Sequence, residues 1–101
     1  MISIISFVKN REILPVLDRL VNKEDGWEGV RAADLETARE HLRNGRFDVI
    51  LLGAGTGDEE RAELRKVIDE TGQQTIMIDH YGGGSGLLYA EVMEALKKAT
   101  D

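Results

Sequence analysis

The chain has 101 residues, of which 42% are hydrophobic and 32% charged, a composition typical of one folded domain rather than a disordered segment. It contains no cysteine, which excludes disulfides, thiolate metal sites and cysteine nucleophiles. The formal net charge of −6 disfavours nucleic acid as a partner, because an acidic surface repels the phosphate backbone. No apolar run approaches the ~18 residues of a membrane span, so the sequence predicts a single cytoplasmic domain over residues 1–101, without membrane attachment.

The first half of the chain alternates between strand and helix patterns. The apolar, β-branched run Ile2–Val8 predicts a buried strand. Asn10 offers an N-cap for a helix whose apolar residues recur at helical spacing as far as Val21, and Gly26 ends that segment. Trp27–Ala33 then predicts a second, weaker strand.

The same alternation continues through the second half. Further strands are predicted at Phe47–Leu52 and Thr75–Ile78, and helices are predicted to start at Asp34, at Thr56 or Asp58, and at Ser85 or Gly86. Strict alternation predicts a parallel sheet with helices on both faces. We therefore expect an α/β three-layer sandwich, (βα)4, with strand order 2-1-3-4, because this order places the two most apolar strands at the centre.

The order of elements resembles the receiver domain of bacterial response regulators, which has a flavodoxin-like fold. The resemblance runs from about Met1 to Ile78 and is clearest in "NREILPVLDRLV" and "GRFDVILLG". The chain is also similar to small bacterial receiver-like proteins of unassigned function that end in a glycine-rich turn and a helix. This resemblance implies a signalling module.

The chemistry of receivers does not carry over to these residues. Receivers end their first strand with an acidic pair that holds magnesium, and here Val8 and Lys9 stand at those positions. The phosphoacceptor aspartate corresponds to Gly53, and the Thr or Ser that closes strand 4 falls near Asp79 and His80. The fifth strand, with its lysine, is missing. The resemblance thus implies a degenerate receiver, shortened by one unit, with no enzymatic activity, metal or cofactor.

Two glycine-rich loops, "GAGTGD" and "HYGGGSG", follow the third and fourth predicted strands. Ligands bind at the carboxyl ends of parallel strands, and glycines let backbone N–H groups approach an anion closely. The candidate anion- or nucleotide-binding residues are Lys9, Gly55, Thr56, His80, Gly82, Gly83, Gly84 and Ser85. Sharp turns or a hinge explain the same glycines without any ligand.

Named catalytic motifs fail in these loops. The dinucleotide and P-loop patterns are not matched. A nucleophile elbow, G-x-S-x-G, needs its second glycine two positions after Ser85, and Gly86 stands one position too early. Ser85 is better explained as a helix N-cap. His41 and His80 are too few for a metal site. The sequence therefore predicts a protein that is not an enzyme.

The last predicted helix carries more apolar side chains than one buried stripe requires. The surplus residues are Tyr81, Leu87, Leu88 and Tyr89, and the fourth strand is a sheet edge because no fifth strand follows it. We therefore expect a non-catalytic interaction module that forms a homodimer, with a further protein partner in a signalling pathway. The alternative is a small anion- or nucleotide-binding protein. A third interpretation is an engineered scaffold, because the helix caps agree well with the fold.

Overall fold

The computed structural model describes residues 1–80 and 85–100. Four parallel strands form one sheet in the order β2-β1-β3-β4, which confirms the predicted topology. The strands are β1 (Ile2–Phe7), β2 (Trp27–Ala32), β3 (Val49–Leu52) and β4 (Ile76–Asp79). The two most apolar strands, β1 and β3, are the central ones, as expected for strands that are covered on both faces.

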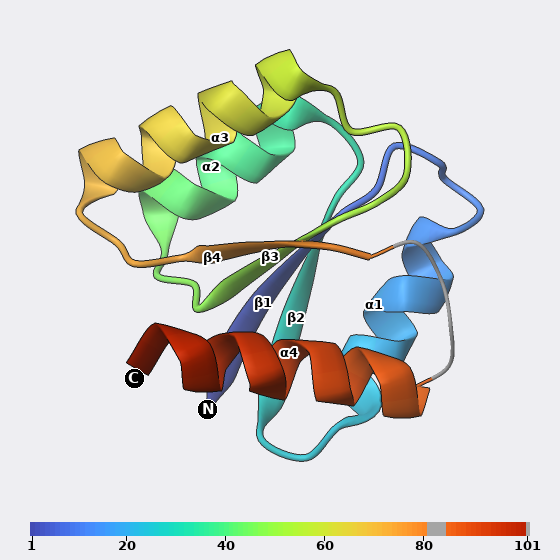
Figure 1. Cartoon of the computed structure of the whole chain (residues 1–101). Coiled ribbons are helices and arrows are strands. Elements are labelled where there is room, and N and C mark those ends of the chain that lie inside the picture. Colours follow the sequence, from blue (N-terminus) through green and yellow to red (C-terminus); the bar gives the residue numbers. More distant parts are fainter. Residues whose placement is uncertain (81–84, 101) are drawn as a thin grey trace.

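The helices are α1 (Leu14–Lys23), α2 (Leu35–Asn44), α3 (Asp58–Thr71) and α4 (Ser85–Thr100). Figure 1 shows α2 and α3 over one face of the sheet and α1 and α4 over the other, which is the predicted three-layer sandwich. The chain therefore returns after β4 to the face that α1 covers. Within the described ranges, no helix combines the length and the apolar character needed to cross a bilayer.

Each face of the sheet has its own apolar core, because successive strand residues point to opposite faces. On β1, Ile5 and Phe7 pack with α2 and α3, whereas Ile4 packs with α1 and α4. All four residues of β3 are fully buried. This rigid double core positions the carboxyl ends of the strands, where the candidate site lies.

The helix starts follow the predicted caps in one of the three cases that can be compared, which is α2. The Asp34 carboxylate accepts the backbone N–H of Thr37 at 2.8 Å, and this bond lowers the pKa of Asp34 below its usual value. The prediction of Asn10 for α1 is wrong, since the N-cap is Ile13. Asn10 Oδ1 instead accepts the N–H groups of Glu12 and Ile13, at 2.9 and 3.2 Å, in the turn before the helix. The prediction for α3 is wrong, since its N-cap is Gly57 rather than Thr56 or Asp58.

Candidate functional site

The strands β1, β3 and β4 end side by side at the carboxyl end of the sheet, where the candidate loops begin. Gly53, directly after β3, donates its N–H to Phe7 O of β1 at 3.0 Å. His80, directly after β4, donates its N–H to Leu52 O of β3 at 2.9 Å. The starting points of the two glycine-rich loops are therefore adjacent, with Val8 and Lys9 of the first strand beside them.

An apolar side chain fills the position where receivers hold their acidic cluster. Val8 is only 4% exposed and lies against buried Gly53. A Cβ placed on Gly53 would lie 3.1 and 3.2 Å from the two methyl groups of Val8, closer than side chains normally pack. Among residues 1–80 and 85–100, no three His, Asp or Glu side chains gather in a group that could hold a metal ion.

Lys9, the candidate cation of the anion site, is already paired. Its Nζ donates to Glu60 Oε1 at 2.8 Å, and the same oxygen accepts the N–H of Gly57 at 2.9 Å. These contacts, first the Gly57 N–H and then Lys9, lower the pKa of Glu60 below its usual value. Glu60 thus occupies the N-terminal end of α3 as an internal anion.

The loop after β3 is closed by its own hydrogen bond. The Thr56 hydroxyl donates to the carbonyl oxygen of Gly53 at 2.8 Å. Gly55 has a φ of 90°, a left-handed conformation that favours glycine, and this accounts for a glycine at that position. Gly55 and Thr56 therefore act here as parts of a tight turn.

His80 is turned into the protein rather than toward these residues. It is 7% exposed, and its Nδ1 lies 3.2 Å from Glu91 Oε1 of α4. Gly82, Gly83 and Gly84 lie outside the described residues, and Ser85 is placed only as the first residue of α4. Of the eight candidate ligand residues, the structure brings together Lys9, Gly55 and Thr56 near the start of α3, where Glu60 already satisfies the cation.

We expect sulfate or phosphate to give no saturable rise in melting temperature beyond that of chloride at matched ionic strength. The reason is that Lys9 is neutralised by Glu60, so that an added anion must compete with an internal carboxylate. Thermal unfolding followed by circular dichroism measures this. Glu60→Gln serves as the comparison, because it leaves Lys9 without that carboxylate. A saturable gain in the wild-type chain would contradict the expectation.

The predicted interface residues do not share one surface. Leu88 is fully buried in the core with Val92, so its assignment to the interface is wrong. Leu87 and Tyr89 are 54% and 45% exposed, but they stand two positions apart, about 200° around the helix. Tyr89 stacks on Trp27, with ring centroids 5.6 Å apart and planes inclined by 10°. Tyr81 lies outside the described residues.

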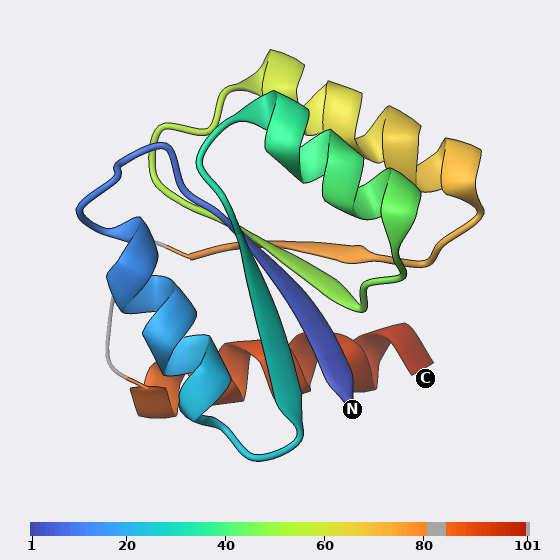
Figure 2. The same cartoon turned by 180° about the vertical axis from the view of Figure 1, so that it is seen from behind.

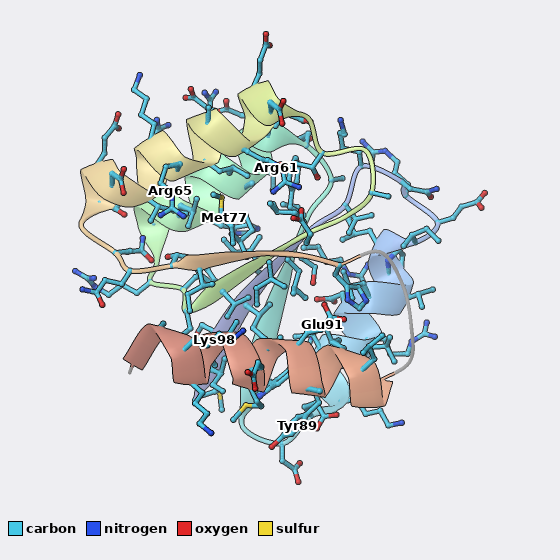
Figure 3. The ribbon with its side chains drawn as sticks, in the orientation of Figure 1. Arg61, Arg65, Met77, Tyr89, Glu91 and Lys98 are labelled. Carbon is cyan, nitrogen blue, oxygen red and sulfur yellow. The ribbon has the colours of Figure 1, made fainter. Side chains whose placement is uncertain are left out.

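The side of α4 that faces β4 is distinct from the side that carries Tyr89. Figure 3 shows Glu91 and Lys98 on the side toward β4 and Tyr89 on the opposite side. Leu87 shares the first of these sides, because it stands four positions before Glu91. A dimer surface that includes the β4 edge can therefore include Leu87 but not Tyr89.

Sequence reasoning missed two arginines beside the same edge. Arg61 and Arg65 of α3 lie near Met77 of β4 in Figure 3, and Arg61 forms an ion pair with Asp79 at the end of the strand. The sequence did carry a signal for them. The two arginines stand four positions apart, and so share one face of a helix whose first turn has three acidic residues.

Solved structures with a similar fold include receiver domains. A CheY-like response regulator receiver domain protein from Methanospirillum hungatei gives a TM-score of 0.66 with 14% identity, over 97% of this chain and 95% of that chain. The Vibrio cholerae chemotaxis protein CheY4 gives 0.64 with 14% identity, over 93% and 98%. This chain has a receiver-like flavodoxin fold.

The receiver-like fold is also similar to that of a designed protein. A de novo designed Rossmann 2x3 fold protein gives a TM-score of 0.59 with 13% identity, over 97% of this chain and 88% of that chain. No family model and no curated protein matches the sequence. At these identities the likeness concerns the fold, and the function must be argued from the residues of the receiver-like chain itself.

Proposed function

We propose that this receiver-like chain is a non-catalytic signalling module that acts in the cytoplasm by protein association, as a homodimer. The observation that carries the proposal is the contact of Val8 with Gly53. The receiver-like frame is intact around these positions, yet a methyl-bearing side chain and a glycine stand where phosphorylation would need carboxylates. A receiver-like fold that lacks the residues for phosphorylation favours a role in binding.

Association is supported by the distribution of apolar surface. Leu87 of α4 is 54% exposed, and the residues of β4 are only partly buried at one margin of the sheet. Burying these groups against a second copy removes apolar area from water, which is the main driving force for stable protein association.

The anion-binding alternative has less support. Its cation, Lys9, is held by Glu60, and the Thr56 hydroxyl is engaged within its own loop. Arg61, which lies at the end of β4, forms an ion pair with Asp79. These positive side chains are therefore engaged by carboxylates of the same chain.

We expect the chain to sediment as a dimer at micromolar concentration, and acetyl phosphate with Mg²⁺ to change neither its mass nor its sedimentation. Position 53 is a glycine where receivers have the phosphoacceptor aspartate, so the phosphoryl group has no carboxylate acceptor there. Intact-mass spectrometry and sedimentation velocity measure the two properties on the same sample. A phosphoryl adduct on an aspartate would overturn the non-catalytic part, and a monomer at high concentration would overturn the association.

A further inference from the structure

The sheet has two outer strands, and side chains of the same chain bind backbone groups on the outer side of β2. Gly29 donates its N–H to Asn22 Oδ1 at 2.8 Å, and its carbonyl oxygen accepts from Asn22 Nδ2 at 3.4 Å. His41 Nε2 donates to the carbonyl oxygen of Arg31 at 2.8 Å. Figure 2 shows this edge with α1 and α2 on either side of it. Backbone groups that are satisfied in this way cannot pair with an added strand.

The outer side of β4 is different. Ile76 donates its N–H to Asp48 O at 3.0 Å and His80 donates to Leu52 O at 2.9 Å, so alternate residues face β3. Between them, the backbone groups of Met77 and Asp79 point away from the sheet. The backbone hydrogen bonds within residues 1–80 and 85–100 do not include these outward groups. The edge at β4 is therefore open in the described part of the chain.

The side chains around this edge combine apolar and charged groups. Met77 is partly buried on the side of α3, and Ile78 is partly buried on the side of α4. Arg61 forms an ion pair with Asp79, whereas exposed Arg65, one helical turn further along α3, makes no ion pair with any described residue. The β4 edge thus combines the apolar side chains of Met77 and Ile78 with the positive charge of Arg65 beside them.

We infer that two copies associate by antiparallel pairing of β4 with β4 of the second copy, which joins the two sheets into one. The inference rests on the proposed homodimer and specifies its geometry. Met77 is the middle one of the outward-facing positions, so a twofold axis at Met77 lets each Met77 exchange both backbone hydrogen bonds with its equivalent. Asp79 of one copy then lies opposite Thr75 of the other.

This register brings opposite charges together. Because α3 runs antiparallel to β4, Arg65 lies beyond Arg61 toward the start of the strand. Four helical positions correspond to about 6 Å along the helix axis. The start of the strand is the end at which Asp79 of the second copy lies in the twofold arrangement. Each copy therefore contributes one unmatched arginine and one accessible carboxylate, a self-complementary pattern that suits a second copy of this chain better than an unrelated partner.

A cysteine introduced at Met77 tests the pairing, since the chain has no other cysteine. In a hydrogen-bonded antiparallel pair the two Cα atoms are about 5.5 Å apart, which suits a disulfide. We expect Met77→Cys to form a covalent dimer under mild oxidation, seen on a non-reducing gel. Met93→Cys is the control, because Met93 is 38% exposed on α4 and stands four positions from Tyr89, on the side away from β4. It should remain largely uncrosslinked.

A second pair of variants tests the charge pattern without altering the strand. Arg65→Glu should weaken the dimer about tenfold, because two symmetric attractions become repulsions. Lys66→Glu makes the same change of charge about 100° further around α3 and should leave the dissociation constant nearly unchanged. Sedimentation at several concentrations gives both values.

The results separate this inference from the proposed function. A dimer in which Met77→Cys does not crosslink preferentially, or in which Arg65→Glu and Lys66→Glu act alike, would overturn the β4 pairing and leave the homodimer in place. A chain that is monomeric at all concentrations would overturn both. Preferential crosslinking at Met77 together with a selective effect of Arg65→Glu would support the pairing.

Discussion

Leu88→Ala is expected to lower the free energy of unfolding by about 2–5 kcal/mol. Leu88 is fully buried and packs with Val92 in the core between α1, α4 and the sheet, so the substitution removes apolar contacts and leaves a cavity. Met93→Ala shortens an exposed side chain of the same helix and should change stability by about 0.5 kcal/mol or less. Urea denaturation followed by circular dichroism, at one protein concentration, measures both.

This pair of variants tests the rotation of α4 about its axis. If Met93→Ala is the more costly substitution, the helix presents a different face to the sheet. If Leu88→Ala weakens association while the stability of the monomer is unchanged, Leu88 belongs to an interface after all. The structure predicts neither result, because Leu88 has no exposed surface.

Gly53→Asp is expected to destabilise the chain without restoring phosphorylation. The new Cβ lies within 3.1–3.2 Å of the Val8 methyl groups, and overpacking of this kind costs about 1–3 kcal/mol. A carboxylate beside an apolar side chain adds a desolvation cost. Val8 and Lys9 still hold the positions that correspond to the acidic pair, so we expect no phosphoryl adduct.

The double variant Val8→Ala/Gly53→Asp provides the control. Removing the methyl groups should return part of the lost stability, so that the two substitutions together cost less than the sum of their separate effects. Urea denaturation of the four chains gives the coupling free energy. Strict additivity, or an aspartate at position 53 that takes up a phosphoryl group, would show that Val8 does not close this position.

The fold was predictable because each of its determinants is local. Short apolar runs predicted the strands, helical spacing of apolar residues predicted the helices, and their alternation predicted a parallel sheet. The order β2-β1-β3-β4 followed from the high apolar content of the two central strands. The strand boundaries of β1, β2 and β4 differ from the predicted ones by one residue, whereas β3 begins two residues later, at Val49 rather than Phe47. The N–H of Phe47 donates instead to Gln73 Oε1 at 2.7 Å, a contact between residues far apart in the sequence.

The candidate site was less predictable because its contacts are long-range. Lys9 and Glu60 are separated by 51 positions, so the neutralisation of Lys9 left no local sequence pattern. At the start of α3, Thr56 and Asp58 are both good capping residues. The N-cap is nevertheless Gly57, whose N–H donates to the Glu60 carboxylate.

The rotation of α4 also lay beyond the local pattern. Several adjacent apolar residues, among them Leu87, Leu88 and Tyr89, do not reveal which one faces the sheet. That choice depends on Val92 one turn later and on the surface of β4. The same pattern therefore led to the incorrect assignment of Leu88 to an interface.

The hydrogen bonds that Asn22 and His41 make along β2 also limit the size of any assembly. A sheet with two open margins can add copies at both ends and grow into a fibre. Here Asn22 and His41 bind backbone groups of β2, so that pairing of β4 with β4 uses the edge strand that is open in the described part of the chain. In the proposed β4 pairing, growth therefore ends at two chains, and the open strand does not lead to polymers.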